Sequence, residues 1–353
     1  MESNMSGRLS ANSTVMHITD CYHGGVGRAI NDMVANAPHL NHVFAFHGDD
    51  TPPSGLFSRE IKVTGNVLSR MRRFSRLLRD SDASIAHVHS SWAGGFIRAG
   101  RNPRLPLIYQ PHCYKFVDPA LPRAQAVAIR LIERLLLSNT SATVVLSPAE
   151  RMAAEEIGAK PTFYVPNVPS VPRGTVDAEA APRRRVIMVG RVSHQKDPEF
   201  FEQVVRQCES EINDVEAVWV GDGDPEMVSF LRHAGVRVTG WMGTTELADL
   251  LSEGGVYIHS ARYEGLPLSV LDAVQRGLPV ALRRIPSLRG VLEERQFDTP
   301  KQLAAEAVRL LNDVSAYRLS IQRTLPWLEE HSNAQQQQSL RRLYDSFAAF
   351  QED

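Results

Sequence analysis

Two acidic residues and the segment between them form the clearest chemical pattern in the chain. Glu264 and Asp272 are eight positions apart, and the apolar residues Val256–His259 predict a strand just before them. Pro267 suits the first position of a helix, which Gly277 would end. The first backbone N–H groups of a helix lack partners within it and attract anions. We therefore expect a phosphate at this helix start, with the two carboxylates accepting hydrogen bonds from neutral sugar hydroxyls.

A pair of basic side chains marks a second candidate site. The predicted strand Arg185–Gly190 leads into a short loop that carries Arg191 and Lys196. Their charges can converge on one diphosphate, and each charge-assisted hydrogen bond contributes about 1.5–3 kcal/mol. Residues 222–224 have the carboxylate spacing of a divalent-metal site, but we interpret them as a turn because Arg191 and Lys196 already supply positive charge.

A glycine-rich loop follows the first predicted strand, Thr14–Thr19. Gly24 and Gly25 would let backbone amides approach a phosphate or a sugar closely, although a tight structural turn has the same composition. The spacing differs from G-x-G-x-x-G, so dinucleotide binding is not predicted.

Histidines follow or occupy two further predicted strands. His112 comes just after Leu107–Gln110, at the end of a strand where open α/β sheets bind ligands. His87 and His89 alternate to one side of the strand over residues 84–91, as two metal ligands would. No third ligand has a suitable spacing, so a structural or acceptor-lining role is favoured for these two.

The Glu264 segment resembles the signature of the retaining GT-B glycosyltransferases of family 4, of the bacterial surface-polysaccharide type. That signature has E-G, a hydrophobic residue and a Pro, which match Glu264 through Pro267. It has a second Glu where this chain has Asp272, one methylene shorter. The family's G-R-x-x-x-x-K-[DN] loop matches Gly190 through Asp197. Weaker matches are the Gly24 loop, the His112 segment and the strand end at Gly240.

The resemblance covers residues 14–350 and implies an α/β chain with the GT-B fold, in which two Rossmann-like domains face each other across a cleft. An acceptor-binding domain is expected over residues 1–165 and a nucleotide-sugar-binding domain over residues 183–334. The proline-rich residues 166–182 are the expected linker. The C-terminal helix, within residues 335–353, is expected to cross back to the first domain.

The resemblance also implies roles for single residues. Arg191 and Lys196 would stabilise the leaving nucleotide diphosphate, and Glu264 and His112 would hold hydroxyls of the donor sugar. The expected catalytic residues are therefore His112, Glu264, Arg191 and Lys196. The expected donor-binding residues are Gly24, Gly25, Gly240, Trp241, Gly265, Leu266, Pro267, Leu268 and Asp272, of which Asp272 would face the ribose. No metal ligand and no cofactor is expected, since the nucleotide-diphosphate sugar is the donor substrate.

The implied function is metal-independent transfer of a hexosyl group, with retention, in cell-surface polysaccharide or glycolipid assembly. The expected partners are a nucleotide sugar and a sugar or lipid-linked acceptor. A non-catalytic GT-B scaffold or partner subunit and a sugar-nucleotide epimerase are the alternatives.

Composition and charge limit the other classes. Three scattered cysteines among 353 residues favour a reducing cytosol. A net charge of −1, without interleaved aromatic and basic residues, gives no reason to expect nucleic acid as a partner. No apolar run approaches the roughly 18–20 residues of a membrane span, and residues 1–13 are expected to be a disordered lead-in.

The predicted helix over residues 67–80 bears on membrane contact. It carries five arginines and an apolar stripe. It could lie on the inner face of the cell membrane, with its apolar side buried shallowly, or it could cover the sheet as an ordinary amphipathic helix. A cytoplasmic protein with peripheral membrane contact is therefore one expectation.

Overall fold

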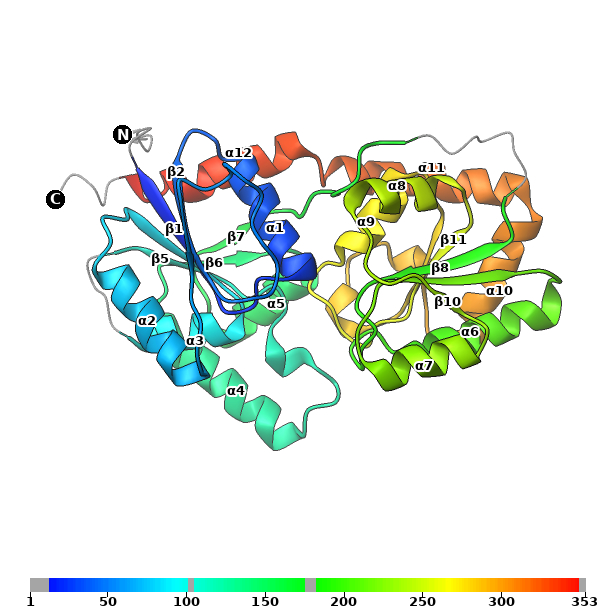
Figure 1. Cartoon of the computed structure of the whole chain (residues 1–353), viewed down its shortest axis with the longest axis horizontal. Helices are drawn as coiled ribbons and strands as arrows, with labels where there is room; N and C mark the ends of the chain where they lie inside the picture. Colours follow the sequence, from blue (N-terminus) through cyan, green and yellow to red (C-terminus); the bar gives the residue numbers. More distant parts are fainter. Residues whose placement is uncertain (1–12, 101–104, 175–181, 349–353) are drawn as a thin grey trace. The chain divides into compact units, whose positions relative to one another are not determined.

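The computed structural model describes residues 13–100, 105–174 and 182–348 (Figure 1). Within them the chain divides into two compact units. Unit 1 contains the residues up to Val168 together with those from Asn333 onward, and unit 2 contains Pro169–Ser332. The predicted lead-in up to residue 12, residues 175–181 of the predicted linker and the chain end at 349–353 lie outside the described residues.

Unit 1 is built on a parallel sheet of seven strands in the order β3-β2-β1-β4-β5-β6-β7. The strands are β1 (Thr14–Thr19), β2 (Asn41–Phe46), β3 (Arg59–Lys62), β4 (Ile85–His89), β5 (Leu107–Gln110), β6 (Ala142–Val145) and β7 (Thr162–Tyr164). The helices are α1 (Gly24–Ala35), α2 (Val67–Arg79), α3 (Ser91–Ala99), α4 (Arg123–Leu136), α5 (Pro148–Ile157) and α12 (Asn333–Asp345). The strand order reverses between β1 and β4, so the loops after these strands diverge and leave room for a ligand.

Helices cover both faces of this sheet, because successive side chains of each buried strand point to opposite faces. On one face, Met16 and Val88 belong to a core that includes residues of α2, α3 and α5. On the other face, Val15 and Ile85 belong to a core with α1 and α12.

The arginine-rich helix α2 is a covering helix. Met71, Phe74 and Leu78 are buried and belong to the core of unit 1. Most of the apolar side of α2 therefore packs on the sheet, which is the covering role considered for this helix, while Val67 and Leu68 at its start are exposed. Four of its arginines are exposed on the opposite side, namely Arg72, Arg73, Arg76 and Arg79.

The C-terminal helix α12 begins at Asn333, earlier than expected, and includes the four consecutive glutamines Gln335–Gln338. Gln336 is buried, accepts a hydrogen bond from Nδ2 of Asn36 at 2.6 Å and donates one to the Pro166 carbonyl at 2.7 Å. These contacts hold α12 within unit 1.

Unit 2 contains a parallel sheet of six strands in the order β10-β9-β8-β11-β12-β13. The strands are β8 (Arg185–Val189), β9 (Glu216–Val220), β10 (Arg237–Val238), β11 (Val256–His259), β12 (Val280–Arg283) and β13 (Gln296–Phe297). The helices are α6 (Pro198–Glu211), α7 (Pro225–His233), α8 (Thr244–Ser252), α9 (Leu268–Gln275), α10 (Pro300–Asn312) and α11 (Val314–Glu329). Its strand order reverses between β8 and β11.

Candidate active site

The charged candidate residues of unit 2 gather at the carboxyl ends of β8 and β11. The loop over residues 190–197 leaves from β8, and the loop over residues 260–267 leaves from β11. These two strands are neighbours at the point where the strand order reverses. Open α/β sheets bind their ligands at such a switch point.

Lys196 and Glu264 form an ion pair at this point. Nζ of Lys196 contacts Oε1 of Glu264, and the two side chains are only 15% and 10% exposed. The backbone N–H of Glu264 also donates to Oγ of Ser287 at 2.9 Å. Because water screens such a partly buried pair only weakly, the pair places strong, fixed charges at the end of the sheet.

A second charged cluster holds the loop that carries Lys196. Asp197 accepts hydrogen bonds from Nε of Arg262 at 2.8 Å and Nη1 of Arg283 at 2.6 Å. Burial opposes ionisation of Asp197, but its hydrogen bonds with Arg262 and Arg283 outweigh burial and lower its pKa. Asp197 also caps α6 by accepting from the Phe200 N–H at 3.3 Å, so the position of Lys196 is fixed by its neighbour.

His259, at the end of β11, lies next to the pair. Its Nε2 is 3.7 Å from Oε1 of Glu264. Burial, followed by the charge of Lys196, holds its pKa well below the usual value, so the ring is neutral. Its Nδ1 is 3.2 Å from the Tyr257 hydroxyl, which also contacts Oγ of Ser269 at 2.8 Å. Nε2 of His259 makes no well-formed hydrogen bond among the described residues.

Helix α9 starts four residues after Glu264. Pro267 precedes the helix, with ψ 116°, rather than being its first residue, so that expectation is wrong by one position. Gly277 ends the helix as expected, with φ 78°, and the Leu278 N–H donates to the Ala273 carbonyl at 3.0 Å. Residues 265–268 are buried, and the first-turn N–H groups of α9 carry the positive end of the helix dipole.

Asp272 lies inside unit 2 and is fully buried. Its Oδ1 accepts hydrogen bonds from the backbone N–H groups of Ser170, at 2.6 Å, and Val171, at 3.3 Å. The carboxylate thus holds two residues within the predicted linker, a role that its sequence context did not suggest. Contact with a ribose stays a prediction.

Three other expected donor contacts lie at strand ends of the same sheet. Arg191 is exposed just after β8. Gly240 has φ 79° and pairs with Gly221 in an isolated bridge. Trp241 is 59% exposed, and an indole ring at a strand end can stack on a planar base.

The acidic turn after β9 serves the fold. Asp224 accepts from the N–H groups of Glu226 and Met227 at 3.0 and 3.1 Å and so caps α7. Oδ1 of Asp222 accepts from the Gly223 N–H at 2.8 Å. These contacts agree with the interpretation of this segment as a turn.

In unit 1 the predicted glycine loop forms the start of α1. Gly24 has φ 52°, and its N–H donates to Oδ2 of Asp50 at 2.9 Å. A Cβ atom at Gly24 would meet nothing within 4 Å, so the glycine is required by its backbone angle and leaves open space above it. Gly25 is exposed beside it.

His112 is the end of a row of imidazoles in unit 1. Its Nε2 is 3.1 Å from Nδ1 of His89, and Nε2 of His89 is 3.1 Å from Nδ1 of His17. Nε2 of His17 is 3.0 Å from Nδ1 of His42. The row ends at the Ala37 carbonyl, 2.9 Å from Nε2 of His42.

That carbonyl fixes the donor and acceptor of every hydrogen bond in the row when all four rings are neutral. A carbonyl only accepts, so His42 carries its proton on Nε2 and accepts on Nδ1. His17, His89 and His112 then each carry their proton on Nε2 as well. His112 then donates from Nε2 and keeps an acceptor lone pair on Nδ1. Burial lowers the pKa of His112 to about 3 and holds that of His89 well below 6.5, so neutral rings dominate at neutral pH.

Families of known proteins match both units. Residues 24–168 match the family described as "Glycosyl transferase 4-like domain", and residues 183–313 match the family described as "Glycosyl transferases group 1". The chain belongs to the group 1 glycosyltransferases. The resemblance seen in the sequence is therefore confirmed.

Individual proteins resemble this glycosyltransferase over most of its length. An uncharacterized 41.2 kDa protein in the cps region of Klebsiella pneumoniae is 23% identical over 301 residues, which are 79% of this chain and 83% of that protein. The UDP-Gal:alpha-D-GlcNAc-diphosphoundecaprenol alpha-1,3-galactosyltransferase of Escherichia coli is 22% identical over 248 residues, 63% of each chain. HepE of Anabaena, solved with UDP and glucose, has a TM-score of 0.78 at 14% identity and covers 95% of this chain and 100% of its own. This likeness confirms the GT-B fold.

The structure of the glycosyltransferase brings several predicted residues together and adds others. Lys196 and Glu264 meet at the carboxyl end of the unit 2 sheet, near the start of α9. His259 was missed, although it is the last residue of a predicted strand, and that position was the available signal. Ser287 was also missed, because no motif marks its bond to Glu264 across 23 residues.

Proposed function

We propose that this glycosyltransferase moves a hexosyl group from a nucleotide-diphosphate sugar to an acceptor hydroxyl, with retention of anomeric configuration. The observation that carries the proposal is the Lys196–Glu264 pair beside the start of α9. Lys196 and the first turn of α9 supply positive charge for the diphosphate. Glu264 offers carboxylate acceptors for sugar hydroxyls, and His259 lies beside it.

In the proposed reaction the bond between the anomeric carbon and the diphosphate oxygen breaks, and its electron pair stays on the diphosphate. The acceptor oxygen forms a bond to the same carbon, and the acceptor hydroxyl gives its proton to the departing diphosphate oxygen. Arg191, Lys196 and the dipole of α9 stabilise the negative charge on the leaving group, and loss of one such group typically lowers kcat by about 10²- to 10³-fold. We propose that these charges act without a divalent metal ion at the diphosphate.

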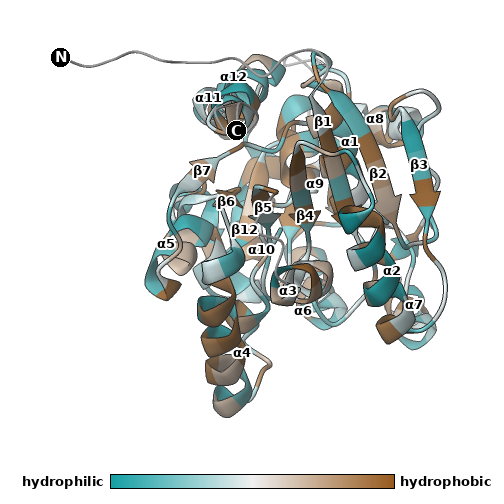
Figure 2. Ribbon diagram, turned by 90° about the vertical axis from the view of Figure 1, so that its left-hand side faces the viewer, coloured by the Kyte–Doolittle hydropathy of each residue, from teal (hydrophilic) through white to brown (hydrophobic). Residues whose placement is uncertain are grey.

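We also propose that the acceptor is lipid-linked and that unit 1 binds an anionic membrane surface through α4. Figure 2 shows α4 as a largely hydrophobic helix. Four apolar side chains on it are each more than half exposed: Val127, Leu131, Ile132 and Leu135. Exposed arginines lie among them, namely Arg123, Arg130 and Arg134. Apolar and basic side chains on one helix suit the boundary between lipid headgroups and acyl chains. Among the described residues, no helix has the length and hydropathy to cross a membrane.

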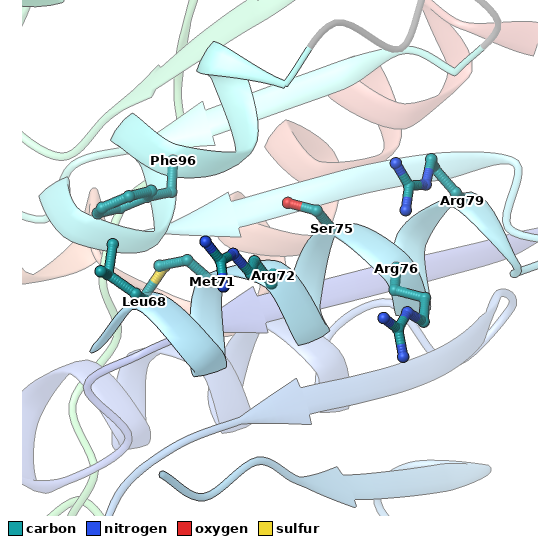
Figure 3. Close-up of a pocket in the computed structure, with 7 residues that line it drawn as sticks. All are labelled: Leu68, Met71, Arg72, Ser75, Arg76, Arg79 and Phe96. Atoms are coloured by element: carbon teal, nitrogen blue, oxygen red, sulfur yellow. The ribbon is translucent and has the colours of Figure 1, made fainter. Parts of the chain in front are cut away.

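A basic hollow near α4 supports a lipid-linked diphosphate as the acceptor. Helix α3 contacts both α2 and α4, and a hollow of about 320 Å³ opens between α2 and α3 (Figure 3). It is lined by Leu68, Met71, Arg72, Ser75, Arg76, Arg79 and Phe96. Three arginines are among these residues, and guanidinium groups suit phosphate oxygens. The name of the Escherichia coli relative gives GlcNAc-diphosphoundecaprenol as an acceptor, which supports the same class here.

Thermal unfolding with UDP, GDP, ADP and their sugar conjugates, each with and without EDTA, tests the donor side. A ligand that binds only the folded state at 100 times its Kd stabilises it by about 2.7 kcal/mol. We expect one nucleotide to raise Tm whether or not EDTA is present, and product NMR to show a retained anomer. No rise with any nucleotide would favour a non-catalytic scaffold, and product without an acceptor would indicate an epimerase.

A further inference from the structure

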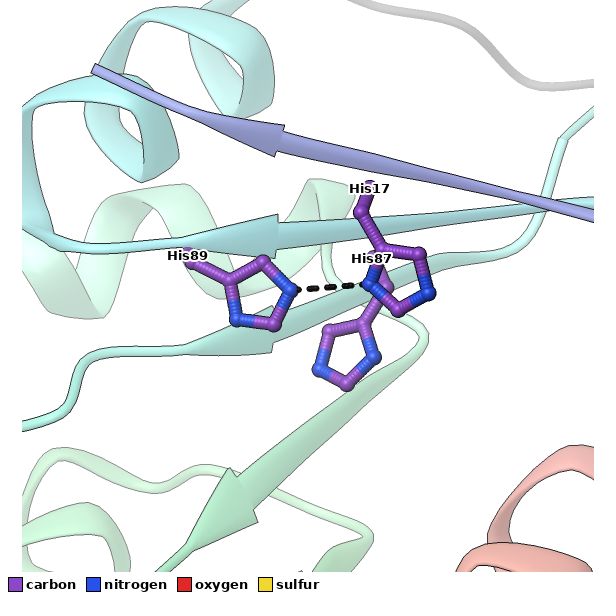
Figure 4. A group of neighbouring side chains, drawn as sticks. All are labelled: His17, His87 and His89. Atoms are coloured by element: carbon purple, nitrogen blue, oxygen red, sulfur yellow. Dashed lines mark hydrogen bonds between the residues drawn. The ribbon is translucent and has the colours of Figure 1, made fainter. Parts of the chain in front are cut away.

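Three histidine side chains meet inside unit 1. His17 lies on β1, and His87 and His89 lie on the neighbouring strand β4 (Figure 4). His17 is directly opposite His87 in the parallel pairing, and residues two apart share one face of a strand. All three are fully buried, on the face that α1 and α12 cover. The sequence showed two of these residues as a pair, and the pairing of β1 with β4 supplies the third.

The ring nitrogens are close enough to share one ion. One nitrogen of each histidine lies within 4.8 Å of the others, and Nδ1 of His17 is 3.1 Å from Nε2 of His89. Two nitrogens bound to a tetrahedral zinc ion at about 2.0–2.1 Å are roughly 3.3 Å apart. Nε2 of His87 is buried and makes no well-directed hydrogen bond in the described part of the chain, although the Gln110 side chain interacts with this histidine. A buried, unpaired nitrogen is unfavourable unless something binds it.

The second ring nitrogen of each histidine already has a partner. The contacts are His17 Nε2 to His42 Nδ1 at 3.0 Å, His87 Nδ1 to the Tyr344 hydroxyl at 3.0 Å, and His89 Nδ1 to His112 Nε2 at 3.1 Å. Partners of this kind orient the ring of a metal-binding histidine and fix which nitrogen faces the ion.

Gln110 can complete the site. It lies opposite His89 on β5 and is fully buried. Its amide makes no well-directed hydrogen bond in the described part of the chain, but its side chain interacts with His87. Three imidazoles and one neutral oxygen make a donor set that suits zinc and neighbouring divalent transition metals.

We propose that His17, His87 and His89 bind one zinc ion within unit 1, with the amide oxygen of Gln110 as the fourth ligand. The site is separate from the donor-binding residues of unit 2 and from the proposed reaction at the diphosphate. Its ligands come from three neighbouring strands, β1, β4 and β5, so the ion would tie the centre of the sheet together.

Zinc binding would also reverse the hydrogen bonding at His112. With Nε2 of His89 on the ion, the proton of His89 stands on Nδ1 and is donated to Nε2 of His112. His112 then carries its own proton on Nδ1, where a metal-free row of neutral rings leaves a lone pair. The ion would thus set whether Nδ1 of His112 donates or accepts.

The experiment uses the tag-free full chain. Elemental analysis of the purified protein should find about one zinc ion per chain. After chelator treatment, Zn²⁺ should raise Tm, and Co²⁺ should give the visible absorption of a tetrahedral nitrogen-ligated ion. His87→Gln should weaken Zn²⁺ binding by more than the roughly 10- to 100-fold that loss of an outer-shell partner costs. His39→Gln, at a partly exposed position of unit 1, should bind as the parent does.

Two results would overturn the proposal. The first is a chelator-treated parent protein that folds but shows neither a Co²⁺ spectrum nor a Tm shift with Zn²⁺, which needs no variant. The second is Zn²⁺ affinity that is equal in the parent and in folded His87→Gln, since that would place the ion at other residues. Donor binding by unit 2 is measured separately, so failure of the zinc site leaves the proposed function untouched.

Discussion

Oδ1 of Asp272 accepts a 2.6 Å hydrogen bond from the backbone N–H of Ser170, 102 residues earlier in the chain. The carboxylate is fully buried and also accepts from the Val171 N–H. Removing a buried charged acceptor leaves two donors without it, so we expect Asp272→Ala to lower the free energy of unfolding by about 1–3 kcal/mol. Urea unfolding measures the change, and Asp249→Ala, at an exposed position of α8, is the control. Equal stability of the two variants would contradict this role.

The ribose role expected for Asp272 leads to a second prediction. If the carboxylate reaches the ribose, the longer Asp272→Glu side chain should raise donor affinity, whereas overpacking at a fully buried site should cost about 1–3 kcal/mol of stability. Calorimetric titration with the donor nucleotide separates the two effects. Unchanged or weaker binding in a folded Asp272→Glu protein would leave only the structural role.

Lys196 is the residue whose loss should affect transfer most directly. Its ammonium is paired with Glu264, and in the proposed function it binds the diphosphate of the donor. We expect Lys196→Ala to lower kcat by about 10²- to 10³-fold, with the fold retained. Steady-state kinetics measures kcat, and circular dichroism checks the fold. Lys301→Ala, at an exposed position of α10, should match the parent in both measurements. Normal turnover in Lys196→Ala would remove the diphosphate assignment.

Local patterns predicted the elements that end at the site. The strands at Thr14–Thr19, Leu107–Gln110 and Val256–His259 have the predicted bounds, because short apolar runs between turn residues describe buried parallel strands. Motif spacing likewise placed Lys196 and Glu264 each after the end of a strand, whereas the sheet order shows that these two strands are neighbours.

Contacts between distant segments were not predictable in this way. β2 was not anticipated, so His42 and the anchor of the imidazole row at Ala37 were missed. His17 and His89 are 72 residues apart, and only the order of strands brings them together. The same is true of Asp272 and Ser170, because a motif position says which residue type occurs and not which backbone groups surround it.

Glu150 gives a prediction for pH. Burial raises its pKa to about 7, although the Leu146 N–H donates to its Oε2 at 2.7 Å. Between about pH 4.5 and 7 the unfolded chain loses this proton before the folded chain does, so the contribution of Glu150 to stability falls as pH rises. The loss is about 1.4 kcal/mol per pH unit, or about 3 kcal/mol in all.

Replacing Glu150 with a side chain that does not titrate should remove this dependence. Relative to the parent, Glu150→Gln should gain about 3 kcal/mol between pH 4.5 and 7, and urea unfolding at several pH values measures the difference. Glu155→Gln, exposed on the same helix, should follow the parent at every pH. If the free energy of unfolding changed with pH in the same way for the parent and Glu150→Gln, Glu150 would ionise in the folded protein as it does in the unfolded chain.

The exposed apolar side chains of α4 give the last prediction. Leu135 is 74% exposed, and burying a leucine side chain in an apolar phase contributes about 1.5–3 kcal/mol. Leu135→Asp should therefore weaken binding to anionic phospholipid vesicles by about 10-fold or more, as measured by co-sedimentation. Leu319→Asp, at a position of α11 that is 46% exposed, makes the same chemical change in unit 2 and should bind as the parent does. An equal loss of vesicle binding in both variants would point to a general charge effect. Unchanged vesicle binding in both variants would remove α4 from the membrane contact.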